Sequence, residues 1–522
     1  MASRSTRVIA LLAVLVALMV VPMSVSANQA RFAGNFGSVI GSVSLGAEKY
    51  FTVNMRDGST PRDAALVANY LRKFGLQVSA SSDNKILFAH GTYGQAGAAA
   101  NTGFVRVQLN GAQFTRTTRP ETFPPAIAGR ILATTIYDGP SMRPHNIYGS
   151  VGSLGILVAP AGGYTPANIA TYYDYTPIYS AGFKGTGRKV AIISCGTALT
   201  ADISKYESIN GIPSNLPTIV KVDGGSTTQD LEPTLDIERE IGTANAVKVT
   251  LYVVPLDCSF SHFADGIAKV EADNVTMHFD SFNISYGATE DFYDATGSDS
   301  LLTAQHADLV DLQAANCWPF VSSGDSGAFA PGSQFLEDGE VTVQYPASDD
   351  HVIAVGGTTA SSKSPTLIAR NKEFGWGLSG GGVSGKFALP TWQVGFPGLE
   401  STSHRNVPDV AFDSDINTGY NIVFTPPGMA QGAFIVGGTS AAAPTWAATL
   451  ALVQQKRVAL GKATLKLVGA KLYAAKGVSG NFFDVTIGDN GFYANKVGYD
   501  AVTGLGVPDA FKLWTFLAVT TP

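Results

Sequence analysis

Strand-like apolar segments and helix-like segments alternate through residues 189–357, and this pattern limits the chain to few folds. The strand candidates read KVAIIS, KVTLYVVPL, FNISYG, WPFVSSG and HVIAVGG. Helices are expected between them, near residues 232–247, 263–272 and 300–316. Strands that alternate with helices predict a doubly wound, mainly parallel α/β sheet. The functional residues of such a sheet lie beyond the carboxyl ends of its strands.

The chain before residue 164 follows a different pattern. Residues 28–138 combine short strand candidates with one helix expected over residues 62–74, where apolar side chains recur at helical spacing. This pattern predicts a small α+β domain. Residues 139–163 are rich in proline and glycine, which predicts an exposed linker, and exposed linkers are where proteases cut. Residues 164–522 would then form the main domain.

The first 27 residues have the features of a secretory signal peptide. Arg4 and Arg7 precede an apolar run over residues 8–21, and small residues lead to a cleavage site after Ala27. A membrane anchor is the weaker alternative, because the run falls short of the roughly 20 apolar residues that span a bilayer. We therefore expect a secreted, extracellular protein with no membrane attachment once the signal is removed.

Charged residues make up only 15% of the chain and its formal net charge is −6. Since no dense basic cluster is present, nucleic acid is excluded as an expected partner. We also expect a monomer. The low charge density also limits self-repulsion in acid. The three cysteines are Cys195, Cys258 and Cys317. A bridge between Cys195 and Cys258, which both follow strand candidates, is one alternative, and buried free thiols are the other.

Ser440 is the candidate nucleophile. It lies in the string GGTSAAAP, directly before an apolar helix that reaches about residue 454. At a helix start, free backbone N–H groups point outward and can form an oxyanion hole beside a serine. The alternative is an ordinary serine N-cap.

The base that activates this serine could be a histidine or a carboxylate. His90 lies in an HGT string typical of a histidine base, but within the N-terminal domain. Glu232 and Asp236 lie four residues apart, on one face of an expected helix, and paired acids this close can share a proton. Asp325 follows a buried strand candidate in SSGD, and a desolvated carboxyl there could donate a hydrogen bond to an oxyanion. The alternatives are a solvated helix face and a turn-forming aspartate.

Several motifs in order resemble those of the sedolisin (serine-carboxyl peptidase) family. The matching strings are the E-x-x-x-D pattern at 232–236, SSGD at 322–325, YPASDDHVIAVGGT, EFGWGLSGGGVS, RNVPDVAFDSDINTGY and the nucleophile motif at 437–440. The resemblance extends from about residue 164 to the end, and residues 28–138 resemble the family's activation propeptide. Pro233 departs from the pattern, and since a residue before proline disfavours the helical conformation, we expect Glu232 at the helix cap.

The resemblance implies a subtilisin-like fold and an acid-active endopeptidase that cuts polypeptides. Ser440, Glu232 and Asp236 would form the catalytic triad, with Asp325 in the oxyanion hole. The propeptide would inhibit the enzyme intramolecularly until acid weakens its charge pairs and the linker is cut. One structural Ca²⁺ would be bound by the side chains of Asp484 and Asp500 and by the carbonyls of Val485, Lys496 and Gly498. The alternatives are a Ser/His/Asp peptidase active near neutral pH and an inactive secreted binding protein of the same fold.

Overall fold

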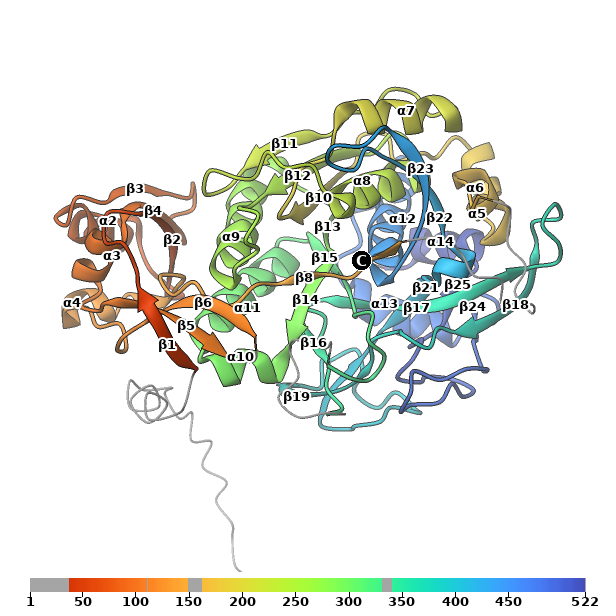
Figure 1. Ribbon diagram of the computed structural model, residues 1–522. Coiled ribbons are helices and arrows are strands. Elements are labelled where there is room, and N and C mark those ends of the chain that lie inside the picture. The colour runs from red at the N-terminus through yellow and green to blue at the C-terminus, as the bar shows by residue number, and fades with distance from the viewer. Residues whose placement is uncertain (1–36, 110, 149–161, 331–339, 522) are drawn as a thin grey trace, which may run out of the picture. The chain divides into compact units, whose positions relative to one another are not determined.

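The computed structural model describes residues 37–109, 111–148, 162–330 and 340–521. The expected signal peptide lies outside these residues. Figure 1 shows the central eight-stranded sheet, with the order β11-β12-β10-β13-β15-β17-β18 and with β21 also paired to β17. All of these pairs are parallel except β17–β18. The strands are β10 (Lys189–Ser194), β11 (Thr218–Lys221), β12 (Lys248–Val253), β13 (Ser281–Ile284), β15 (Trp318–Ser322), β17 (Ile353–Ser362), β18 (Arg370–Gly375) and β21 (Val410–Asp413).

Helices cover both faces of this sheet, which confirms the doubly wound fold. Successive residues of a strand point to opposite faces. Accordingly, Val190 and Ile192 of β10 belong to one core cluster, whereas Ala191 and Ile193 belong to another. The first cluster includes α8 (Leu231–Thr243), α12 (Thr439–Ala459), α13 (Val468–Lys476) and α14 (Ala510–Val519); the second includes α9 (Phe260–Met277) and α11 (Asp299–Ala314).

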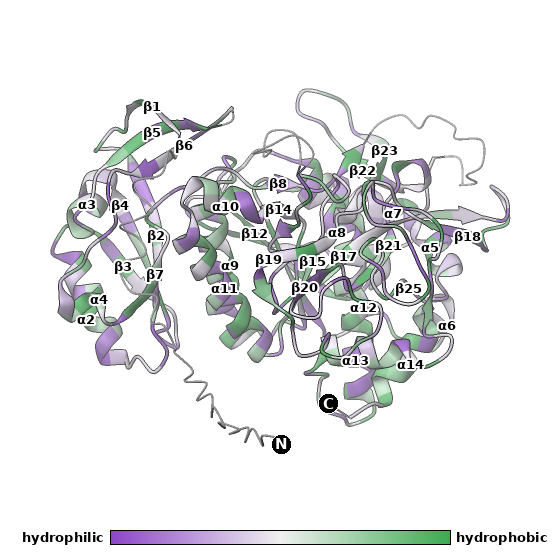
Figure 2. Ribbon diagram, turned by 90° about the horizontal axis from the view of Figure 1, so that it is seen from below, coloured by the Kyte–Doolittle hydropathy of each residue, from purple (hydrophilic) through white to green (hydrophobic). Residues whose placement is uncertain are grey.

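The main domain has further elements around the sheet, among them two short strands that frame the candidate site, β14 (Tyr286–Thr289) and β23 (Gly432–Gly437). Helices such as α9 and α11 carry both hydrophobic and hydrophilic residues (Figure 2). The other elements are α5 (Pro166–Tyr172), α6 (Thr176–Ser180), α7 (Thr200–Asn210), α10 (Glu290–Thr296), β16 (Gln344–Tyr345), β19 (Gly382–Ala388), β20 (His404–Val407), β22 (Tyr420–Phe424), β24 (Phe482–Phe483) and β25 (Val507–Pro508), with a 3₁₀ turn over Ile416–Thr418.

Residues 37–138 build the predicted α+β structure around a core of their own. A four-stranded antiparallel sheet has the order β3-β4-β2-β7, and a three-stranded sheet has the order β1-β5-β6. The expected helix is α2, whose Thr60 and Asp63 form a capping box. The elements are β1 (Ser38–Ser42), β2 (Glu48–Met55), α2 (Pro61–Arg72), β3 (Gln77–Ala80), β4 (Ile86–Thr92), α3 (Tyr93–Ala99), β5 (Phe104–Leu109), β6 (Ala112–Thr117), α4 (Pro125–Ala128) and β7 (Ile131–Thr134).

Contacts between this N-terminal part and helices α9 and α11 include polar side chains beside an apolar cluster that Val107 and Phe114 join. Asn54 donates to the carboxyl of Asp308, and Thr135 donates to Asp265. Lys85 forms a half-exposed ion pair with Asp311. Burial raises the pKa of Asp308 well above its ordinary value, so this carboxyl is neutral in acid. The Lys85–Asp311 ion pair is a contact of this boundary that acid would weaken, and the expectation that acid loosens the boundary stays a prediction.

The described part of the linker is only partly exposed: Arg143, Pro144 and Tyr148 are exposed. Gly139, Pro140 and His145 are buried. Residues 143–148 include two short strands, β8 (Arg143–Pro144) and β9 (Ile147–Tyr148), which pair with β14 and β23 of the main domain. These pairings satisfy backbone groups that a free linker would expose to water.

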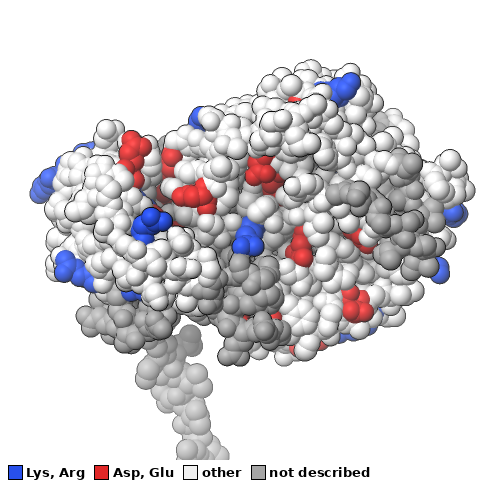
Figure 3. All heavy atoms as spheres, viewed as in Figure 1, with Lys and Arg blue, Asp and Glu red and all other residues white. Residues whose placement is uncertain are grey.

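Cys195 and Cys258 form a disulfide, which selects between the two alternatives left open by the sequence. Cys317 is a buried free thiol. Every helix among the described residues is too short or too polar to cross a bilayer. Acidic and basic side chains are scattered sparsely on the face drawn in Figure 3, as the low charge content predicts.

Candidate active site

Ser440 lies at the start of α12, as the sequence predicts. Gly438 precedes this helix with a φ of +103°, a conformation that favours glycine. The chain therefore turns sharply from β23 into α12 and directs the backbone N–H of Ser440 outward, where it donates to the carbonyl of His145 at 2.9 Å. The Ser440 hydroxyl donates to the carbonyl of Ser285 at 3.2 Å. The side chain is fully buried.

Glu232 and Asp236 lie on the buried face of α8, and both are fully buried. The helix begins at Leu231, so Glu232 lies in its first turn and our expectation of a cap position is wrong. Pro233 is tolerated there because a first-turn N–H has no partner within the helix. The side chain of Asn146 donates a hydrogen bond to Glu232 Oε2, and the Ser440 side chain lies close enough to oppose the rise in the pKa of Glu232. The structure places this acid beside the serine.

The two acids influence each other's protonation. Burial and the neighbouring charge of Asp236 raise the pKa of Glu232 well above its ordinary value. Burial also raises the pKa of Asp236, while the hydroxyl of Ser285, 2.7 Å from Asp236 Oδ1, opposes that rise. A pair of carboxyls in such a site holds a shared proton over a wide pH range.

Asp325 lies in the turn after β15 and faces the first residues of α12. Its Oδ1 accepts hydrogen bonds from the backbone N–H and the hydroxyl of Thr439, both at 2.8 Å. Its Oδ2 is buried without a hydrogen-bond partner among the described residues. Burial raises the pKa of Asp325 to about 7. In acid, the protonated Oδ2 is therefore a hydrogen-bond donor without an acceptor among the described residues.

A chain segment crosses the site in an extended conformation. Before the site, β8 pairs with β14, and the N–H of His145 donates to the carbonyl of Ser285 at 3.0 Å. After the site, β9 pairs with β23. A Cβ placed on Gly438 would lie 2.3 Å from the His145 carbonyl oxygen and 2.6 Å from Asp325 Oδ2, so both oxygens face the same small space.

The sequence assigned no role to His145, yet its side chain is only 4% exposed and fills a pocket of the site. Its Nδ1 lies 2.7 Å from the Ser322 hydroxyl, and its Nε2 lies 2.7 Å from Gln344 Oε1. Burial lowers the pKa of His145 to about 4. The ring nitrogens are thus engaged away from Ser440. The missed residues are His145, Asn146, Ser285 and Gln344, and none of them lies in a motif that would have signalled it.

His90, the histidine of the HGT string, lies on β4 of the N-terminal part. Its ring stacks on Tyr50, with centroids 4.0 Å apart. Glu48 lies 3.9 Å from its Nε2. These contacts belong to the small N-terminal domain and give this imidazole no role at Ser440.

The structure brings the five expected calcium ligands into one region. Gly498 N–H donates to Asp484 Oδ2 at 2.9 Å, and Lys496 N–H donates to Asp500 Oδ2 at 3.2 Å. Asn495 Nδ2 reaches the Val485 carbonyl and both oxygens of Asp500. Lys476 forms an ion pair with Asp484. The two carboxylates and the Val485 carbonyl, which are oxygen donors of the kind that calcium prefers, thus contact an ammonium or amide nitrogens.

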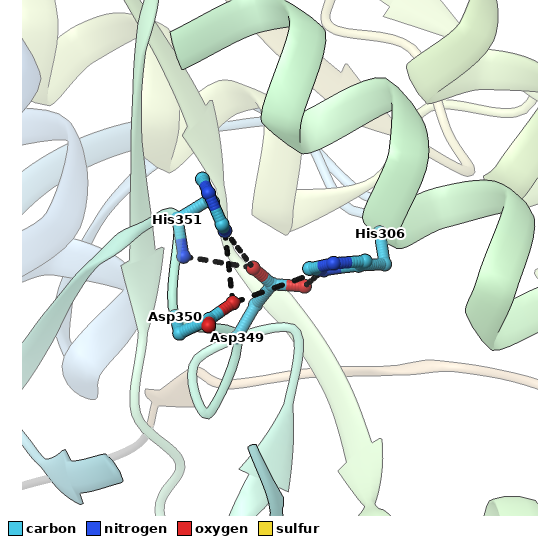
Figure 4. A group of neighbouring side chains, drawn as sticks. All are labelled: His306, Asp349, Asp350 and His351. Atoms are coloured by element: carbon cyan, nitrogen blue, oxygen red, sulfur yellow. Dashed lines mark hydrogen bonds and ion pairs between the residues drawn. The ribbon is translucent and has the colours of Figure 1, made fainter. Parts of the chain in front are cut away.

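Another group of side chains could hold a metal ion, and sequence reasoning did not select it. His306, Asp349, Asp350 and His351 offer ligand atoms that all lie within 4.8 Å of one another. Figure 4 shows His306 reaching from its helix toward the loop of the other three. Each imidazole Nδ1 lies 2.8 Å from a carboxylate oxygen, His306 from Asp349 and His351 from Asp350. Although burial opposes it, the Asp349 hydrogen bond and charge raise the pKa of His306.

Comparisons with known proteins agree with this fold. The model of the subtilase family matches residues 226–474. Kumamolisin from Bacillus sp. (strain MN-32) is 30% identical over 379 residues, which cover 67% of this chain and 63% of the relative. Sedolisin from Pseudomonas sp. (strain 101) is 28% identical over 490 residues, covering 88% of this chain and 79% of the relative. The chain thus spans less than two thirds of the length of kumamolisin.

A solved structure of Pseudomonas sedolisin, complexed with two molecules of pseudo-iodotyrostatin, superposes with a TM-score of 0.58 at 26% identity. The match covers 68% of this chain and 98% of that one. The fold and the family match define a protein of the subtilisin-like peptidase class. Within that class, the chain is similar to peptidases of the sedolisin (serine-carboxyl peptidase) family.

Proposed function

We propose that this protein is a secreted, acid-active serine-carboxyl endopeptidase made as a zymogen. The observation that carries the proposal is the arrangement around one backbone carbonyl. The Ser440 N–H donates to the carbonyl of His145, Asp325 Oδ2 faces the same space, and Glu232 lies beside the Ser440 side chain, which opposes the rise in the pKa of that carboxyl. These are the contacts that acyl transfer to a serine requires.

In the proposed reaction, the Ser440 hydroxyl attacks the substrate carbonyl carbon while Glu232 takes its proton. Asp236 is a positioning residue that tunes Glu232 by its charge and by sharing a proton. Glu232 then gives the proton to the leaving amine, and a water molecule hydrolyses the acyl-enzyme by the reverse sequence. A carboxylate has a lower ordinary pKa than an imidazole, so a carboxylate base favours activity at lower pH than a histidine base would allow.

Asp325 would supply the second hydrogen bond to the oxyanion, beside the N–H of Ser440. Its two bonds from Thr439 fix Oδ1 as the acceptor oxygen and leave Oδ2 for the proton. Because the pKa of Asp325 is raised to about 7, the acid form predominates at lower pH. Removing one oxyanion donor typically costs about 10²- to 10³-fold in kcat.

The zymogen part of the proposal assigns residues 1–27 to the signal peptide, 28–138 to an inhibitory propeptide, 139–163 to the linker that is cut, and 164–522 to the catalytic domain. Residues 143–148 support it, because they occupy the site as a substrate would. With this segment in place, polypeptide substrates are excluded. Asn146 of this segment also donates a hydrogen bond to Glu232 and helps to keep that carboxyl buried.

We also propose a single structural Ca²⁺ bound by Asp484 and Asp500 with the carbonyls of Val485, Lys496 and Gly498. The two carboxylates and the Val485 carbonyl already gather around nitrogen donors, Lys476 and Asn495, that a cation would replace. The ion would supply a crosslink that rigidifies the loop and would take no part in the reaction.

Hydrolysis of casein by the purified protein tests the proposed activity. We expect activity near about pH 4 that Ser440→Ala and Glu232→Gln each remove. Activity that peaks near neutral pH and survives Glu232→Gln would favour the Ser/His/Asp alternative. No hydrolysis by a well-folded, matured protein would favour the inactive binding protein.

A further inference from the structure

The pocket that holds the His145 ring is shaped for an imidazole. Gly287 of β14 forms one wall, where a Cβ would lie only 2.7 Å from His145 Cε1 and 3.0 Å from Nε2. Gly324 makes room for Gln344, because a Cβ there would lie 2.5 Å from the Gln344 amide nitrogen. The two glycines thus accommodate the ring and its partner side chain.

Both ring nitrogens of His145 have a polar partner at 2.7 Å. With Gln344 Oε1 facing it, Nε2 carries the proton and donates, and Nδ1 accepts from the Ser322 hydroxyl. Ser322 is fully buried and Gln344 is 4% exposed. A side chain without these two nitrogens would leave Gln344 Oε1 without its partner and Ser322 with only its 3.4 Å contact to the Ile284 carbonyl, which disfavours it.

The His145 carbonyl is the group that faces the proposed nucleophile. Ser440 N–H donates to it at 2.9 Å, and Asp325 Oδ2 faces the same space. On the other side of this carbonyl, the side chain of Asn146 contacts Glu232. The amine that would leave on cleavage of the His145–Asn146 bond therefore lies beside the group that would protonate it.

Resting on the proposed function, we infer that Ser440 cuts the protein's own His145–Asn146 bond during maturation, and that Ser322 and Gln344 make the site selective for histidine on the acyl side of the cut bond. In this step, Ser440 Oγ bonds to the His145 carbonyl carbon and the bond to the Asn146 nitrogen breaks. Glu232 transfers the serine proton to that nitrogen. One water molecule then releases His145 as a new carboxyl terminus.

The bond assignment is tested with the purified full-length protein at about pH 5. Intact-mass analysis and N-terminal sequencing should find a new chain that begins at Asn146. Ser440→Ala should remain uncut. His145→Leu should be cut at this bond at least tenfold more slowly, because Ser322 and Gln344 lose their partners. A first cut at another bond, or an equal rate for His145→Leu, would overturn the assignment.

The selectivity is tested with the matured enzyme and two peptides, Arg-Pro-His-Asn-Ile-Tyr and the same sequence with leucine for histidine. We expect kcat/KM to be at least tenfold higher for the histidine peptide, and Gln344→Leu to reverse the order. Equal values in the wild type would overturn the selectivity. Because the ratio compares two substrates on one enzyme, partial misfolding of Gln344→Leu does not affect it.

Failure of this inference is distinguishable from failure of the proposed function. If the wild type hydrolyses casein but shows equal kcat/KM for the histidine and leucine peptides, the proposed peptidase activity stands and only the histidine selectivity is contradicted. A Ser440→Ala protein that is cut as fast as wild type, with no other protease present, would remove the self-cleavage itself.

Discussion

Asn146, which lies on the segment that joins the two parts of the chain, donates a hydrogen bond to the carboxylate of Glu232. The segment therefore reaches the most buried acids of the main domain. Its backbone pairs with β14 on one side and with β23 on the other. Inhibition and substrate binding would thus use the same contacts, which leads to the following predictions.

Replacing Asp325 should change the alkaline side of the activity profile. Since its pKa is about 7, the wild type should lose kcat as pH rises through that value, because the donor proton is lost. Asp325→Ala should lower kcat by about 10²- to 10³-fold. Asp325→Asn keeps a donor without a titrating proton and should lose activity less and show no decline near that pH. An unchanged alkaline limb in Asp325→Asn would argue against this role. Kinetics from about pH 3 to about pH 9 measure it.

Asp236→Asn should move the acid side of the profile. The charge of Asp236 raises the pKa of Glu232, so its removal lowers that pKa and keeps the base ionised in stronger acid. We expect the acid limb of kcat/KM to shift to lower pH, with a loss of about tenfold or more in kcat. A merely structural role would reduce activity equally at every pH.

Gly438→Ala should abolish carbonyl binding at the site. The new Cβ would lie 2.3 Å from the oxygen of a bound carbonyl, and the φ of +103° is unfavourable for alanine. We expect more than about 10²-fold loss in kcat/KM. Gly461→Ala is the matched control, because its φ is +67° and nothing lies within 4 Å of the added Cβ. The control should lose about 1 kcal/mol of stability and keep its activity. Equal activities would contradict the assigned carbonyl site.

Calcium removal should destabilise the matured protein. At a calcium concentration 100 times Kd, binding stabilises by about 2.7 kcal/mol, so excess chelator should lower Tm by several degrees. Added calcium should restore the loss, and Asp500→Asn should remove the response. A melting curve that is identical with and without chelator would show that Lys476 and Asn495 complete this loop without an ion.

The stability of uncut Ser440→Ala should fall as pH rises. Burial raises the pKa of Asp308 in the folded protein, so the group contributes stability that is present below its unfolded pKa of about 4 and lost as pH increases toward the folded value. Adding Asp308→Asn keeps an acceptor oxygen for Asn54 and should flatten the decline. Thermal melts at several pH values measure both proteins, and parallel curves would exclude this contribution.

The sequence predicts the sheet and four of the site residues because their signals are local. Strand and helix alternation depends on side-chain periodicity, and each proposed catalytic residue lies in a short string at a strand end or helix start. The expected helix ends differ by a few residues from α8, α9 and α11. Glu232 was placed wrongly at the cap because proline's effect on the preceding residue weakens in the first turn.

The pocket could not be predicted in this way. His145 lies 177 residues from Ser322 and 199 residues from Gln344, its two ring partners. His145 lies in a stretch rich in proline and glycine, and nothing near it in the sequence distinguishes it from an ordinary linker residue. Its burial depends on the pairing of β8 and β9 with distant strands, which local patterns do not reveal.

The most direct measurement is kcat/KM against pH for the matured wild type and Glu232→Gln, with melting curves to confirm folding. If a carboxylate activates Ser440, wild-type activity should be highest in acid and Glu232→Gln should lose at least about 10³-fold at every pH. Full activity in folded Glu232→Gln, or a wild-type profile that rises with an apparent pKa of about 6.5, would contradict it.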